Sequence, residues 1–395
     1  MPSPWRFLSE AAYLKGARMK IRDVTLTAIS YPAPITLRWG RGERREMGGT
    51  IVQVVTDEGI VGIGDATAPI KAVRPILESV VKPLLIGENP LDVGRLWAAM
   101  ARGVKGGAHA DLIGGIDVAL WDVVGKVAGL PLFRLFGAVR DSVPVYAAPS
   151  MRQPDALMDE LATYPERGFR ATKLRIGLGP VGWADGPRDQ RRDVAILERA
   201  RDLLGPNFTI GADTDKTYDH AMAARLAPVV HACDLAWFEE PLPNLEREQY
   251  VREMLRLREV VRVPLSGGQG FFAPEQFDEL INRNAVDIVQ PDVNHAGGLT
   301  PLRKIAHMAE GRGLACMPHV SCHLGSDVIT VATAHALAAM PNGPWCCYQA
   351  YDTPLRTDLL TEPVKVVDGE LKLNERPGLG IEIDPHALAR FAVEG

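Results

Sequence analysis

The sequence predicts an α/β protein in which a (β/α)8, TIM-like barrel follows an N-terminal α+β domain. The chain has 395 residues, more than the roughly 250 that one barrel requires. After Asp141, short apolar segments alternate with longer helical patterns, as in repeated βα units. From about Asp352 this alternation stops, and turns with short strands follow. We therefore expect two domains and a C-terminal segment.

The N-terminal domain begins with strands. Residues 20–30 are strand-like, and residues 50–66 show a hairpin pattern that turns at residues 57–59. Residues 1–18 lack the apolar core of an export signal. We therefore expect a poorly ordered extension there, with Met19 as an alternative start.

A helical pattern completes this domain. Between residues 111 and 138, apolar side chains recur at helical spacing, and the sequence Gly129-Leu130-Pro131 ends the regular run. We place the α+β domain at residues 19–140.

The barrel prediction depends on eight apolar strand candidates, spaced roughly 25–40 residues apart as in βα units. They are residues 143–148, 171–176, 208–213, 235–240, 263–268, 285–292, 313–319 and 344–349. Eight such units are the number that closes a barrel. We place the barrel at residues 141–352, and we expect residues 353–395 to return to the first domain.

Polar residues recur at the C-terminal ends of these strands, which is the end where barrel active sites lie. They are Lys173, Arg175, Asp213, Glu239, Gln269, Asp292, His319 and Gln349. Any strand that leaves a core ends in polar residues. That general tendency does not explain why carboxylates, a lysine and a histidine recur at the same relative point, so we expect an active site at the barrel mouth.

The composition excludes several classes of protein. The formal net charge of -5 offers no basic face for nucleic acid, and no run of about 18 apolar residues indicates a membrane span. The five cysteines lie in apolar surroundings, which is more typical of buried thiols than of disulfides. Adjacent Cys346 and Cys347 leave a redox or metal pair as the alternative. We expect a soluble protein of the reducing cytoplasm.

The order of the strand-end residues resembles the mandelate racemase group of the enolase superfamily, with muconate lactonizing enzymes and acid-sugar dehydratases, over nearly the whole chain. The residues that carry this resemblance are Lys173-x-Arg175, Asp213, Glu239-Glu240-Pro241, Asp292 and His319. In addition, residues 117–138, 290–300 and 375–384 resemble the end of the family's capping domain, its sixth strand and loop, and its C-terminal return. The resemblance implies that residues 19–140 are a capping domain and that the protein is a homo-oligomer.

The family's shared chemistry removes the proton α to a carboxylate and gives an enediolate that a divalent ion stabilises. The resemblance implies one Mg²⁺ per subunit, with Asp213, Glu239 and Gln269 as ligands. Oxygen ligands suit this hard cation. Gln269 stands where the family usually has glutamate, so its amide oxygen is able to coordinate the ion but brings no charge.

The glutamine leaves three outcomes open. In the first case, the ion binds more weakly but polarises the substrate more strongly, because the ligands neutralise less of its charge. Alternatively, Asp215 or Glu240 is recruited as a third carboxylate. In the third case, metal binding has been lost.

Asp292 and His319 resemble the family's Asp–His dyad, in which the carboxylate orients the imidazole and supports its charged form. Lys173 and Arg175 lie on one face of their strand, because strand side chains alternate. The family's usual motif is Lys-x-Lys with the second lysine as base, but a guanidinium stays protonated at neutral pH. We therefore expect His319 to be the only base, while the two cations hold the substrate. Two alternatives stay open. Lys173 is the base, or both cations are merely paired with the acidic ligands.

The substrate contacts are less well defined. Gln349 lies at the eighth strand, where the family often has a glutamate, and its amide donates a hydrogen bond but delivers no proton. His295 follows the sixth strand and is a candidate pocket residue. Arg38, Trp39 and Arg41 occupy the place of the family's mobile capping loop. They are either contacts to an anionic or polyhydroxylated ligand or part of a solvated loop.

The leading functional hypothesis is dehydration of an aldonic or aldaric sugar acid to a 2-keto-3-deoxy acid, which would make the protein a hydro-lyase. The second hypothesis is a racemase, epimerase or cycloisomerase that uses the same intermediate, with Lys173 as second base. A third, from a different class, is a non-catalytic acid-binding protein, which Gln269 and Gln349 motivate. In each case we expect the partner to be a small carboxylic acid.

Overall fold

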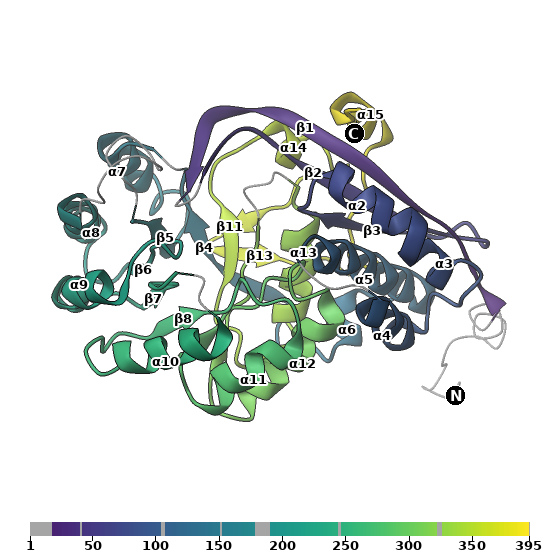
Figure 1. Ribbon diagram of the computed structural model, residues 1–395. Coiled ribbons are helices and arrows are strands. Elements are labelled where there is room, and N and C mark those ends of the chain that lie inside the picture. The colour runs from purple at the N-terminus through teal and green to yellow at the C-terminus, as the bar shows by residue number, and fades with distance from the viewer. Residues whose placement is uncertain are drawn as a thin grey trace, which may run out of the picture.

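The fold is that of a barrel with an added α+β domain, as predicted (Figure 1). The computed structural model describes residues 18–39, 42–103, 107–150, 152–177, 190–243, 246–321 and 326–394. In Figure 1, the outer helices α7 to α12 surround the barrel strands on the left and below, and helices α2 to α5 lie to the right. Within these described ranges, no helix is long and apolar enough to cross a membrane.

The N-terminal domain is built on an antiparallel sheet in the order β1-β2-β3. Its strands are β1 (Ile21–Trp39), β2 (Gly42–Thr56) and β3 (Val61–Ala66). The predicted hairpin turn is confirmed, since β2 ends and β3 begins on either side of residues 57–60. The helices are α2 (Ile70–Ile76), a π-helical turn (Leu77–Val81), α3 (Lys82–Leu85), α4 (Val93–Gly103), α5 (Gly107–Ala128) and α6 (Leu132–Leu135).

Helix α5 contains the predicted helical pattern and packs closely on β3. The approach is so close that a Cβ atom added to Gly64 would lie 2.1 Å from the Gly115 carbonyl oxygen. The far side of α5 contacts the barrel, where Trp121 Nε1 donates to Thr300 Oγ1 (2.9 Å) and Asp117 accepts the Thr300 N–H (2.8 Å). This helix therefore joins the two parts of the molecule.

The barrel contains eight parallel strands at the predicted places. They are β4 (Ser142–Ala148), β5 (Ala171–Arg175), β6 (Thr209–Asp213), β7 (Trp237–Glu239), β8 (Leu265–Gly267), β9 (Ile288–Val289), β10 (Ala315–Cys316) and β11 (Cys346–Gln349). Each pairs with its sequence neighbour from β4 to β10, and β11 returns to pair with β4. The helices between them are α7 (Pro154–Ala162), α8 (Gln190–Leu204), α9 (His220–Ala232), α10 (Arg247–Leu257), α11 (Pro274–Asn282), α12 (Leu299–Glu310) and α13 (Val328–Leu337).

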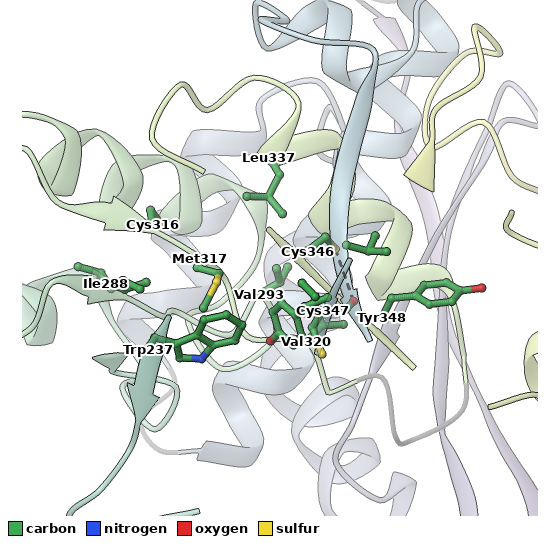
Figure 2. Packing of buried hydrophobic residues seen from close by; sticks show 14 of the residues in the cluster. Trp237, Ile288, Val293, Cys316, Met317, Val320, Leu337, Cys346, Cys347 and Tyr348 are labelled. Atoms are coloured by element: carbon green, nitrogen blue, oxygen red, sulfur yellow. Dashed lines mark hydrogen bonds between the residues drawn. The ribbon is translucent and has the colours of Figure 1, made fainter. Parts of the chain in front are cut away.

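Figure 2 shows part of the barrel core, whose buried residues include Trp237, Met317, Cys346 and Cys347. Both adjacent cysteines are buried as free thiols. Burial also raises the pKa of Cys346 well above its usual value. A thiolate is needed for redox or metal chemistry, so Cys346 is a core residue. Cys347 is buried next to it in the same core, and the alternative role of the pair is not supported.

The C-terminal segment contacts both parts of the molecule. It consists of α14 (Pro354–Thr357), β12 (Val366–Val367), β13 (Glu370–Lys372) and α15 (Pro385–Phe391). Strand β13 pairs antiparallel with barrel strand β4, and Ala392 forms a bridge to Ile29 of β1.

Candidate active site

Three neighbouring barrel strands bring four of the predicted site residues together. Arg175 at the end of β5 is in register with Asp213 at the end of β6, which is in register with Glu239 at the end of β7. Lys173 lies two residues before Arg175 and points to the same side of the sheet. Because the strands are parallel, these side chains meet at the C-terminal end of the barrel, as the sequence predicts.

The lysine joins the two carboxylates. Lys173 Nζ lies 3.1 Å from Asp213 Oδ2 and also contacts Glu239 Oε1. Arg175 Nη2 lies 3.4 Å from the same Asp213 oxygen. The side chains of Asp213 and Glu239 are fully buried, and that of Lys173 is 5% exposed. Two buried anions thus face one buried cation, Lys173, and one partly buried cation, Arg175.

The pKa values follow from this arrangement. Burial by itself would lower the pKa of Lys173, but the charges of Asp213 and Glu239 raise it above its usual value. Burial would likewise raise the pKa of Asp213, but Lys173 and Arg175 hold it well below its usual range. In this state the lysine is an ammonium group that binds anions, not a base.

The second oxygen of Glu239 has its own partners. Glu239 Oε2 accepts hydrogen bonds from Gln290 Nε2 (2.7 Å) and Trp237 Nε1 (3.1 Å). These donors fix the carboxylate, so that Oε1 is the atom directed at Lys173. Gln290 was not among the predicted site residues, although a polar side chain within the apolar segment of residues 285–292 was an available signal.

Gln269, just beyond β8, is the third predicted metal ligand. Its side chain is buried, and its Oε1 atom has no hydrogen-bond partner among the residues that the structure describes. Two carboxylates and an unpartnered amide oxygen at neighbouring strand ends form a donor set of the kind that a hard divalent cation takes. The described part of the chain contains no cluster of three His, Cys, Asp or Glu side chains able to hold a metal. The residues present therefore fit a divalent ion with Gln269 as the third ligand.

Asp215 and Glu240, the carboxylates predicted as alternative metal ligands, contact other groups. The Asp215 N–H donates to Asp213 Oδ1 (2.7 Å), and the charge of Asp215 helps to raise the pKa of Arg175 against the effect of burial. Glu240 Oε2 lies 2.9 Å from Lys216 Nζ, and burial raises the pKa of Glu240 to about 7. Recruitment of either carboxylate to a metal stays a prediction.

The Asp292–His319 pair forms as predicted. His319 Nδ1 lies 2.7 Å from Asp292 Oδ2, which also accepts from Ser321 Oγ (3.0 Å). The other carboxylate oxygen, Oδ1, accepts the backbone N–H groups of Asn294 (2.9 Å) and His295 (3.1 Å). The carboxylate holds the proton of His319 on Nδ1, which leaves Nε2 as the basic nitrogen. Ser321, which the sequence analysis missed, lies two residues after His319.

His295 connects the barrel to the capping domain. Its Nδ1 lies 3.0 Å from the Gln269 carbonyl oxygen, and its Nε2 lies 3.7 Å from Asp111 Oδ1 on α5. Its ring packs edge-on against Phe272. Because a carbonyl only accepts, Nδ1 carries a proton and Nε2 faces the carboxylate. The side chain of His295 is 30% exposed, which is compatible with the predicted position in a pocket. No pattern in the sequence indicated that Asp111 belongs to the site.

The structure gives less information about the other predicted substrate contacts. Gln349 is buried at the end of β11, and its Nε2 donates to the Tyr351 carbonyl (3.3 Å). For Arg38 and Trp39 the structure describes the backbone alone, in which they pair with Glu43 and Gly42. Arg41 lies outside the described residues. The roles of all four stay predictions.

Comparison with known proteins identifies the family. Residues 156–387 match the family "Enolase C-terminal domain-like", and residues 22–137 match "Mandelate racemase / muconate lactonizing enzyme, N-terminal domain". The chain therefore belongs to the mandelate racemase group of the enolase superfamily, which confirms the resemblance seen in the sequence.

Three similar proteins indicate the kind of enzyme. Arabinonate dehydratase of Saccharolobus solfataricus is 30% identical over 342 residues, which cover 84% of this chain and 87% of that protein. D-galactarolactone cycloisomerase of Agrobacterium fabrum is 29% identical, with 86% and 90% covered. The crystal structure of a racemase from Streptomyces coelicolor with bound magnesium has a TM-score of 0.83 and 26% identity, with 94% and 100% covered. The chain is an enzyme of this family, a lyase with isomerase as the alternative class.

Proposed function

We propose that the protein dehydrates a sugar acid, aldonic or aldaric, to a 2-keto-3-deoxy acid. The observation that carries this proposal is the Asp292–His319 pair, which provides a positioned base at Nε2. His319 removes the α-proton of the acid, and the electron pair of the broken C–H bond forms a C=C bond. The β-hydroxyl leaves with the proton that His319 then returns, so that water is released. The resulting enol tautomerises to the keto acid.

The other residues bind and orient the acid. Asp213, Glu239 and Gln269 would hold Mg²⁺, and the bound ion supplies positive charge that lowers the cost of removing a proton next to a carboxylate. Lys173 and Arg175 are the cations available to the substrate carboxylate. The racemase with bound magnesium supports the metal, and arabinonate dehydratase supports the substrate class.

The test is a screen of aldonic and aldaric acids with the Mg²⁺-loaded enzyme, in which the keto product is detected by its semicarbazone. We expect at least one acid to give a keto acid and the His319→Asn variant to give none. No keto acid from any member of the panel would contradict the proposal.

The isomerase alternative uses Lys173 as a second base, and the cycloisomerase relative supports it. It predicts solvent deuterium at the α-carbon of recovered substrate with inversion. The raised pKa of Lys173 argues against it in the state that the structure shows. Assembly as a homo-oligomer and a cytoplasmic location stay predictions.

A further inference from the structure

The two proposed carboxylate ligands are already opposed by positive charge. Asp213 and Glu239 carry two negative charges, and Lys173 and Arg175, which contact them, carry two positive charges. Asp215 adds a negative charge that acts on Arg175. Glutamate at position 269 would add one more negative charge, so Gln269 weakens the attraction of this group for a divalent ion.

Lys173 also occupies the atoms that an ion would need. It contacts Glu239 Oε1 and Asp213 Oδ2. The other oxygens of these carboxylates are committed, since Glu239 Oε2 accepts from Gln290 and Asp213 Oδ1 accepts from the Asp215 N–H. The carboxylates therefore present one oxygen each, and the ammonium group and a divalent ion compete for the same two.

Lys173 is not free to leave these oxygens without a new partner. It is almost fully buried, and the ring centroid of Tyr146 lies 5.7 Å from Nζ. A buried ammonium without an anion is strongly unfavourable. Its flexible four-carbon stem permits a small shift, but the shift must end at another negative charge.

We propose that Lys173 keeps the metal site closed until the acid arrives, so that the divalent ion and the carboxylate substrate bind together. The substrate carboxylate supplies the negative charge that Gln269 lacks and becomes the new partner of the displaced ammonium group. The inference rests on the proposed function for the identity of the ligand as an acid. Because binding linkage is reciprocal, the ion strengthens acid binding by the same factor.

The decisive experiment is a calorimetric titration of chelator-treated protein with Mg²⁺ alone. We expect Lys173→Met to bind Mg²⁺ about tenfold more tightly than the wild type, within the range typical of coupled sites. Lys126→Met is the matched control, because it removes an ammonium group that contacts the buried carboxylate of Asp122 on α5 rather than the two ligands. This control should stay within about twofold of the wild type. Equal affinities for Lys173→Met and the wild type would overturn the proposal.

A second variant covers the case in which Lys173→Met does not fold. Gln269→Glu restores the missing charge, and it should tighten the binding of Mg²⁺ alone by a similar factor. Tight binding of Mg²⁺ by the wild type without acid, unchanged in Gln269→Glu, would also overturn the proposal. Neither result depends on turnover. Failure of the dehydration screen therefore contradicts the proposed function, whereas equal Mg²⁺ affinities contradict this inference.

An acid that the wild type dehydrates gives a direct measure of the coupling. In the His319→Asn variant, which cannot remove the α-proton, that acid should raise the affinity for Mg²⁺ by about tenfold. The same acid should have little effect on Mg²⁺ binding when Lys173→Met is added. An unchanged Mg²⁺ affinity with bound acid would contradict linked binding while leaving the dehydration itself established.

Discussion

The Asp292–His319 pair and the Asp213–Glu239–Gln269 group lie at the same end of the barrel but differ in how far they are assembled. Asp292 accepts four hydrogen bonds from protein groups, and His319 is held in one tautomer. In the other group, Lys173 occupies both carboxylates, and the Gln269 amide oxygen has no partner among the described residues. The proton-transfer residues are thus preorganised by the protein, whereas the binding residues must rearrange when ligands arrive.

The largest expected effect comes from Asp292→Asn. An asparagine would turn its amide N–H groups towards His319 and favour the tautomer in which Nε2 carries the proton. We expect kcat/KM for dehydration to fall by about 10³-fold, the middle of the range for general base catalysis. Mg²⁺ affinity measured on the same sample should stay the same if the two groups act separately. A loss of less than tenfold in kcat/KM would contradict the preorganised dyad.

Gln290→Leu tests the other group. The change removes a donor to Glu239 Oε2 and leaves Trp237 as the remaining donor described there. Outer hydrogen-bond partners of metal ligands typically contribute about tenfold to hundredfold to affinity, so we expect Mg²⁺ binding in the presence of the acid to weaken by that much. Gln290 Oε1 has no partner among the described residues, so the melting temperature should change little. Unchanged metal affinity would show that the hydrogen bond from Gln290 does not position Glu239 for the ion.

Asp111→Asn tests whether the capping domain influences the binding residues. Asp111 Oδ1 lies near His295 Nε2, and His295 holds the Gln269 carbonyl. Loss of an ion pair of this kind is worth up to about 1 kcal/mol, so we expect Mg²⁺ affinity to fall by about threefold. Burial raises the pKa of Asp111, which means that its charge costs stability in the folded state. The melting temperature measured by calorimetry should therefore not fall. A loss of stability with full metal affinity would make Asp111 purely structural.

Ser321→Ala has the smallest expected effect. The change removes a neutral hydrogen-bond donor to Asp292 Oδ2, so the carboxylate that orients His319 is held less firmly. The low end of the range for a neutral hydrogen bond is about 0.5 kcal/mol, so we expect kcat/KM for dehydration to fall by about twofold. Ser321→Thr, which keeps the hydroxyl, should restore kcat/KM. A kcat/KM of Ser321→Ala equal to that of the wild type would contradict this role.

The sequence by itself determined the fold and the order of the site residues. The eight apolar strand segments predicted the barrel, and residues at their C-terminal ends predicted the location of the site. This works because parallel strands of a barrel end at one face and because side chains alternate along a strand. The pairing of Asp292 with His319 was expected from the family resemblance, and it forms because the two residues lie at the ends of neighbouring strands and make a parallel bridge.

The tertiary structure decided the contacts that set the chemistry of the binding residues. That Lys173 joins Asp213 and Glu239 depends on where a long, flexible side chain ends, which the spacing along a strand does not determine. The approach of Asp111 to His295 joins residues of different domains and depends on how α5 docks against the barrel. Local sequence patterns specify which face a residue occupies, whereas the partner of a buried charge is chosen by packing across the whole molecule.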